Sequence, residues 1–261
     1  MKIIVLMKQV ANKDAVLRIS SDEKWINETD VALQTNESDG YALEEALRLK
    51  EAKGEGEVVV CSLGPQSAKT VIKDALARGA DRAIHVVADN SSKLSPYQIA
   101  DAIANAIRDE NADLVLAGLQ SDDASYGQSG VILAELLGIP HATIVIEVDR
   151  SSLNGNVRIK RELESGWYQW FVYKLPALLT IQSGISQIRY ASLKGIMGAK
   201  KKEIRDVPIS TTEFSSAQKV EKLYIPLKTK QTQMLGNGDA KAGAKELVEK
   251  LKNEVRVILI G

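Results

Sequence analysis

The loop at residues 118–130, GLQSDDASYGQSG, carries the residue types of a ligand-binding segment. It follows the apolar run LVLA and precedes a helical pattern, so the QSG at its end would open a helix. The free N–H groups and positive dipole end of a helix N-terminus form a natural phosphate site. Three glycines in the loop would let the backbone approach a ligand closely.

The two aspartates in this loop, Asp122 and Asp123, allow two interpretations. Loop carboxylates often cap a helix. Beside a ligand they would repel a phosphate, but they suit a ribose hydroxyl or an adenine amino group. The candidate contacts of the loop are Asp122, Asp123, Ala124, Ser125, Tyr126, Gly127, Gln128, Ser129 and Gly130.

Three further segments could line the same site, because ligands of open parallel sheets bind beyond the carboxyl ends of strands, near the point where the strand order reverses. They are residues 7–10 (MKQV), 36–39 (NESD) and 62–65 (SLGP). The sequence contains neither G-x-G-x-x-G nor G-x-x-x-x-G-K-[ST], so neither common nucleotide fingerprint applies. We find no Ser-His-Asp or Cys-His set and no metal cluster, and we expect no catalytic residues.

The composition is typical of a globular protein, with 44% hydrophobic and 26% charged residues in a chain of 261. Lys plus Arg and Asp plus Glu both count 34, which disfavours a general nucleic-acid binder. One cysteine excludes an internal disulfide. We expect Cys61, His85 and His141 to be structural.

No apolar run approaches the length of a membrane span. MKIIVLMKQV has a short apolar core and no small-residue cleavage site, so we expect a strand there and a cytoplasmic protein.

Apolar runs and helical patterns alternate over the first two thirds of the chain. The predicted strands are residues 3–7, 57–63, 83–87, 113–117 and 142–148, and the predicted helices begin near residues 42, 68, 99 and 132. Short continuous apolar runs are typical of strands buried on both faces. Strand–helix–strand spacing predicts a mostly parallel sheet with helices on its faces, the doubly wound α/β class.

The pattern changes near residue 150. Residues 157–163 and 167–173 predict an antiparallel hairpin, and residues 177–181 predict another strand. After Gly184 the regular apolar spacing is lost until about residue 240, yet the segment is too apolar for pure disorder. We therefore expect an α/β domain at 1–184 and an extended arm at 185–240 that docks on another chain. Residues 241–261 would form a helix and a tail, with 255–260 a strand or an anchor.

The arm begins with RYASLKGIMGAKKKE, where Leu193 sits among small and basic residues without the spacing that would bury it. A leucine in this setting is expected to be presented on the surface. The lysines at 200, 201 and 202 fit either a solvated turn or a surface for an anionic partner.

These segments together closely resemble the β subunit of the electron transfer flavoproteins, over essentially the whole length. The resemblance rests on VLMKQV, on NESD followed by ALEEALRLKE, on SLGP with ALARGADRAIHV, on RELESG through LPALLT, and on RYASLKGIMGAKKKEI, which is similar to the family's recognition loop.

The resemblance implies a heterodimer with a larger α subunit that holds one FAD, with this chain forming one side of the flavin pocket and burying one structural AMP. Electrons would pass from acyl-CoA or other dehydrogenases to a quinone oxidoreductase or another acceptor. The AMP contacts would be Leu6, Asn36, Glu37, Ser38, Asp39, Leu63 and residues 122–130. Leu193 would anchor a dehydrogenase, assisted by Tyr190, Lys194, Lys200, Lys201 and Lys202.

Other functions remain open at this stage. Electron-bifurcating relatives bind a second FAD in place of AMP and tend to carry a D-G-D-T run where this chain has DDAS at 122–125, which favours the AMP type. A flavin-free nucleotide-binding protein on the same sheet and a purely structural partner protein are the other candidates, since a fold alone does not identify a function.

Overall fold

The computed structural model describes residues 1–261 except 30, 152, 211–219, 228–231 and 255–261. The chain forms two compact units, residues 1–223 and residues 224–261. The first unit carries the sheet and every candidate site residue named above.

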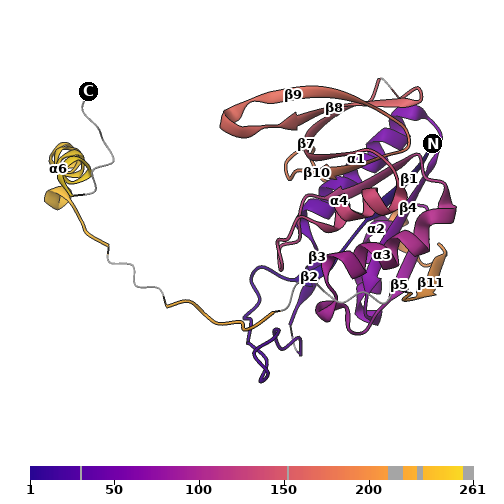
Figure 1. The fold of residues 1–261 in the computed structure, drawn as a ribbon, viewed down its shortest axis with the longest axis horizontal. Coiled ribbons are helices and arrows are strands. Elements are labelled where there is room, and N and C mark those ends of the chain that lie inside the picture. The colour runs from indigo at the N-terminus through magenta and orange to yellow at the C-terminus, as the bar shows by residue number, and fades with distance from the viewer. Residues whose placement is uncertain (30, 152, 211–219, 228–231, 255–261) are drawn as a thin grey trace. The chain divides into compact units, whose positions relative to one another are not determined.

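A nine-stranded sheet forms the centre of the first unit, in the order β11-β5-β4-β1-β6-β10-β7-β8-β9 (Figure 1). Every neighbouring pair from β11 to β7 is parallel, and β8 and β9 extend the sheet as an antiparallel hairpin. The strands are β1 (Lys2–Leu6), β4 (Glu57–Gly64), β5 (Arg82–Val87), β6 (Leu114–Gly118), β7 (His141–Asp149), β8 (Asn156–Glu162), β9 (Tyr168–Lys174), β10 (Ala177–Ile181) and β11 (Ile204–Pro208).

Helices cover both faces of this sheet, so the α/β doubly wound prediction is confirmed. The helices are α1 (Glu37–Lys53), α2 (Lys69–Arg78), α3 (Pro96–Ile107) and α4 (Ser129–Leu137). Alternate side chains of β1 show the two layers. Ile3 and Val5 share a core with α1 and α2, whereas Ile4 and Leu6 share a core with α3 and α4.

Short elements complete this unit. Strands β2 (Gln9–Ala11) and β3 (Leu33–Thr35) pair antiparallel in a separate sheet. Single 3-10 turns cover Gln66–Ala68, Ser91–Lys93, Arg108–Glu110 and Glu164–Gly166. The predicted structural roles fit Cys61 and His85, which are buried in β4 and β5, whereas His141 is exposed at the start of β7.

The segment after Gly184 is more ordered than its sequence suggests. Helix α5 (Leu193–Ala199) packs against α2, and β11 pairs with β5 at the edge of the main sheet. Both elements are short. Helix α5 makes its contact with α2 through small residues, and β11 is an edge strand, so neither needs a long periodic apolar pattern. A docking arm over residues 185–240 stays a prediction, but its first part belongs to the unit of residues 1–223.

The second unit contains the predicted C-terminal helix, α6 (Ala240–Asn253), preceded by a 3-10 turn at Gly236–Gly238. Asp239 caps α6 by accepting hydrogen bonds from the backbone N–H groups of Lys241 and Ala242. The prediction of a strand or anchor at 255–260 lies outside the described residues.

Candidate functional site

The strand order reverses between β1 and β6, and the predicted ligand loops gather at the carboxyl ends of these strands. Strands β4 and β5 lie on one side of β1, and β6 and β10 lie on the other. Such a reversal opens a crevice in which ligands of doubly wound sheets bind. The sheet thus brings together the loop after β1, the start of α1 and the loop after β6.

Asp39 connects these two strand ends from the first turn of α1. Its Oδ2 accepts a hydrogen bond of 2.8 Å from the Lys8 N–H, and its Oδ1 accepts one of 2.9 Å from the Gly118 N–H. Burial raises the pKa of Asp39 to about 7, while the two backbone donors act to lower it. Asp39 therefore holds the two sides of the crevice together.

Asn36 and Ser38 join the start of α1 to the loop after β6. The Asn36 Nδ2 group donates to the Gln120 carbonyl at 3.0 Å, and Asn36 Oδ1 accepts from the Asp122 N–H at 2.9 Å. Ser38 Oγ donates to the same Gln120 carbonyl at 2.8 Å. Both side chains are buried, so their polar groups mainly fix the loops in place.

The two aspartates of the loop have separate partners. Asp122 Oδ2 accepts from the Glu37 N–H at 3.1 Å, so it caps α1, one of the two roles considered from sequence. The Asp123 carboxylate binds Lys8 Nζ at 2.6 and 2.7 Å. Partial burial acts to raise the pKa of Asp123, but the Lys8 ammonium and the hydrogen bonds from Ser121 and the Ala124 N–H together outweigh burial and hold that pKa below its usual value. The negative charge of Asp123 is thereby compensated.

The second half of the loop turns sharply before it enters α4. Ser125 and Gly127 adopt left-handed φ angles of 52° and 62° before α4 begins. No side chain caps α4, which leaves its first-turn N–H groups available to an anion. A Cβ at Gly130 would lie 2.9 Å from Thr180 Cγ2, so only glycine lets the helix start this close to β10.

Apolar side chains form the remaining wall. Leu6 at the end of β1 is buried, Leu63 near the end of β4 is partly buried, and Ala117 lies near the end of β6. All three belong to the layer that contains α4. Tyr126 is 48% exposed above the loop, while Ala124 is partly buried and Gln128 is exposed. An apolar wall, a polar loop and a free helix N-terminus are together suited to an adenine nucleotide, but these contacts stay a prediction.

The predicted docking residues lie on a different part of the unit, around α5. The exposed fractions are 96% for Tyr190 and 82% for Leu193. Lys194, Lys200 and Lys201 are exposed.

Lys202 differs from the other lysines because it is only partly exposed. Its Nζ donates to the Leu76 and Ala80 carbonyls at the end of α2, at 2.9 and 2.5 Å. Desolvation lowers the pKa of Lys202. Because the Lys202 ammonium is hydrogen-bonded to these carbonyls, Lys202 is less suited than the other lysines to attracting an acidic partner.

Two contacts that the sequence analysis did not predict are central to the structure. Lys8 compensates Asp123, and Arg189 anchors the segment before Leu193 through glutamates of α1. A lysine directly after a buried strand could have indicated the first contact. Nothing local in the sequence indicated the second.

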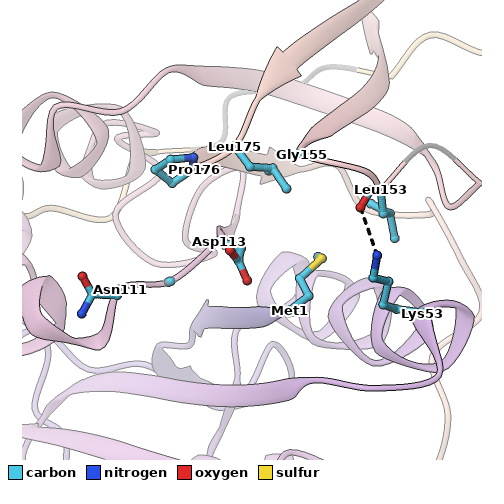
Figure 2. Close-up of a pocket in the computed structure, with 9 residues that line it drawn as sticks. Met1, Lys53, Asn111, Asp113, Leu153, Gly155, Leu175 and Pro176 are labelled. Atoms are coloured by element: carbon cyan, nitrogen blue, oxygen red, sulfur yellow. Dashed lines mark hydrogen bonds between the residues drawn. The ribbon is translucent and has the colours of Figure 1, made fainter.

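A cavity of about 550 Å³ lies at the opposite ends of the strands. Figure 2 shows Met1, Asp113 and Pro176 around it, with Lys53 hydrogen-bonded to the Leu153 carbonyl at 3.4 Å. It shares no residue with the loops at the strand reversal.

Among the described residues no group of three or more His, Cys, Asp or Glu is placed to hold a metal ion. No helix in the described part of the chain is both long and apolar enough to cross a membrane.

Comparison with known proteins gives a consistent result. The family model described as "Electron transfer flavoprotein domain" matches residues 24–212. "Electron transfer flavoprotein subunit beta" of Methylophilus methylotrophus is 36% identical over 245 residues, which cover 90% of this chain and 93% of the relative. The Arabidopsis thaliana protein of that name, designated mitochondrial, is 34% identical over 99% of this chain and 100% of its own length. The human protein is 34% identical over 85% of this chain and 88% of its own.

Proposed function

Because this chain belongs to the electron transfer flavoprotein β subunit family, we propose that it is the non-catalytic subunit of an electron-carrying heterodimer. It pairs with a larger α subunit and forms one side of a flavin pocket whose main part lies on α. Bound FAD supplies the redox chemistry, and the residues of this chain position and shield it. Acyl-CoA or other dehydrogenases donate the electrons, and a quinone oxidoreductase or another acceptor receives them. A cytoplasmic location stays a prediction.

The site at the strand reversal is proposed to hold one AMP as a structural ligand. The observation that carries this proposal is the uncapped N-terminus of α4 beside a loop in which the charge of Asp123 is already compensated by Lys8. The phosphate would bind N–H groups of residues 129–131. The base would lie against Leu6 and Leu63, and the ribose would face the loop at 122–126.

Leu193 is proposed to insert into a pocket on the dehydrogenase. A large apolar side chain that is 82% exposed has no packing role in this chain. A few such residues can carry most of the binding energy of an interface. Lys194, Lys200 and Lys201 would speed encounter with an acidic partner.

Nucleotide content tests the proposal directly. The chain is co-expressed with its α subunit, the complex is purified and denatured, and released nucleotides are quantified. We expect one FAD and one AMP per heterodimer. Two FAD and no AMP would instead indicate an electron-bifurcating protein, and the absence of FAD would contradict both functions.

Docking is tested separately with Leu193→Ala in the same complex. The dehydrogenase is an acyl-CoA dehydrogenase that reduces the wild-type complex, driven by its acyl-CoA substrate. We expect a raised KM for the complex as electron acceptor and unchanged FAD and AMP content. Unchanged KM would show that Leu193 is not the anchor.

A further inference from the structure

Arg189 is held by two carboxylates of α1. Its backbone N–H and its Nε donate to Glu44 Oε2 at 3.0 and 2.9 Å. Its Nη1 and Nη2 donate to the two oxygens of Glu51 at 2.5 and 3.0 Å, and Nη2 also reaches Glu44 Oε1 at 3.1 Å. This forked pairing fixes the guanidinium group and the backbone at the same residue.

Arg48, which lies between these glutamates on α1, contacts the same segment two residues earlier, at Gln187. Its Nη2 donates to the Gln187 carbonyl at 2.9 Å, and its Nε donates to Glu44 Oε1 at 2.7 Å. Glu44 thus serves both arginines, and its side chain is only 3% exposed. The chain is therefore fixed at residues 187 and 189, directly before Tyr190.

The other end of the segment is fixed to α2. A Cβ at Gly195 would lie 2.2 Å from the Ala77 carbonyl oxygen, so α5 touches the α2 backbone. Lys202 Nζ donates to two carbonyls at the end of α2. Ser192 Oγ caps α5 by accepting from the Gly195 N–H at 3.1 Å. The exposed Tyr190 and Leu193 lie between two attachment points.

We infer that Arg189 is a positioning residue for partner docking, whose pairing with Glu44 and Glu51 presents Tyr190 and Leu193 in the conformation that a dehydrogenase binds. The inference rests on the proposed docking function of Leu193. Ordering a loop at the moment of binding costs affinity, and a segment that is already ordered avoids this cost. Arg189 itself need not touch the partner. Loss of its pairing would free residues 190–192 and weaken docking without altering the flavin or AMP sites.

The test compares Arg189→Ala with a matched variant, Arg150→Ala, in the complex with the α subunit. Arg150 also makes two hydrogen bonds, at 3.1 and 2.8 Å, to a buried glutamate of α1, Glu45, but it holds the end of β7. Arg189→Lys keeps the charge and loses the fork. Kinetics with the acyl-CoA dehydrogenase give KM and kcat. Hydrogen–deuterium exchange of residues 190–199, measured in the complex without the dehydrogenase, reports how well this segment is ordered before docking.

We expect Arg189→Ala to raise KM by about tenfold, as expected for the loss of order in one or two side chains and the backbone between them. Its kcat should stay within about twofold, its exchange at 190–199 should be faster, and Arg189→Lys should restore part of both losses. Arg150→Ala should change neither KM nor this exchange. Leu193→Ala should raise KM while leaving exchange unchanged.

The outcomes separate the two hypotheses. A wild-type KM for Arg189→Ala beside a raised KM for Leu193→Ala would overturn the positioning role alone. A wild-type KM for Leu193→Ala would overturn the docking proposal itself. Equal effects of Arg189→Ala and Arg150→Ala on KM would show a general loss of stability, and would also overturn the positioning role.

Discussion

The Gly118 N–H donates a hydrogen bond of 2.9 Å to Asp39 Oδ1, and this contact leaves no room for a side chain at residue 118. A Cβ there would lie 2.4 Å from the same oxygen and 2.2 Å from Ser38 Oγ. Both neighbours are buried and hydrogen-bonded, so they have little space to retreat. The close approach of α1 to the end of β6 therefore requires glycine.

Gly118→Ala should lower the free energy of unfolding by about 1–3 kcal/mol, the usual cost of overpacking a buried contact. Urea unfolding of the complex gives the shift in midpoint, and the AMP content should fall with it because the crevice is forced open. Gly198→Ala is the matched control. A Cβ at Gly198 meets no heavy atom within 4 Å, and alanine favours the helix, so its midpoint should be unchanged or higher. Equal midpoints for the two variants would contradict the steric argument.

Lys8 is expected to help the complex retain AMP, because its ammonium compensates the charge of Asp123. Lys8→Met removes the ammonium that binds Asp123 at 2.6 Å and leaves an uncompensated carboxylate beside the proposed phosphate site. Retained AMP per heterodimer should fall, because like charges in a partly buried site repel. The double variant Lys8→Met with Asp123→Asn should recover much of it.

Lys53→Met serves as the control, since Lys53 contacts the Leu153 carbonyl at the other end of the strands. It should retain wild-type AMP. If Lys8→Met also retained wild-type AMP, charge compensation by Lys8 would play no part in binding.

The sequence predicts those features of the fold that depend on local pattern. Residues 3–7 form a continuous apolar run, and residues 177–181 are apolar except for Thr180, because both faces of β1 and β10 are buried in the centre of the sheet. The glycines and polar residues at 118–130 likewise indicated a ligand loop beside a helix start. The nucleotide itself was suggested by resemblance and stays a prediction.

Features that depend on distant pairing could not be predicted in this way. Arg189 and Glu44 are separated by 145 positions, and a charged residue in the sequence does not identify its partner. Helix α5 contacts α2 through a glycine, and β11 is a five-residue edge strand, so neither shows a long apolar period. Their order depends on contacts with elements that precede them by many residues.

Glu110 should contribute to stability at neutral pH, because three cations converge on it. Its carboxylate lies 3.3 Å from Lys2 Nζ, 2.5 Å from Arg82 Nη2 and 2.9 Å from Arg205 Nη2, and its side chain is 12% exposed. Glu110→Gln should lower the free energy of unfolding at pH 7 by about 1–3 kcal/mol. The hydrogen bond from Arg82 holds the pKa of Glu110 below its usual value.

The contribution of Glu110 is present above the pKa of the unfolded chain and is lost as the pH falls through the lower folded pKa. The difference in the free energy of unfolding between wild type and Glu110→Gln should therefore shrink as the pH falls below 4.5, the ordinary glutamate pKa. Glu135→Gln, at an exposed position on α4, should show no such difference. A constant difference across the acid range would mean that packing, not charge, explains the effect.

Asp39 should have the opposite effect to Glu110, because its contribution to the free energy of unfolding decreases as the pH rises, and it does so in a higher pH range. Burial raises the pKa of Asp39 from 3.8 to about 7. Between these values the folded protein keeps a proton that the unfolded chain has lost, so raising the pH favours unfolding. The free energy of unfolding should fall by at most about 1.4 kcal/mol per pH unit.

The test compares wild type with Asp39→Asn, in which residue 39 cannot titrate. The free energy of unfolding of wild type minus that of Asp39→Asn should fall from pH 5 to 7 and level off above pH 8. Urea unfolding of both proteins at half-unit steps measures this difference. A difference that stays flat from pH 5 to 8 would show that the N–H groups of Lys8 and Gly118 keep Asp39 ionised despite its burial.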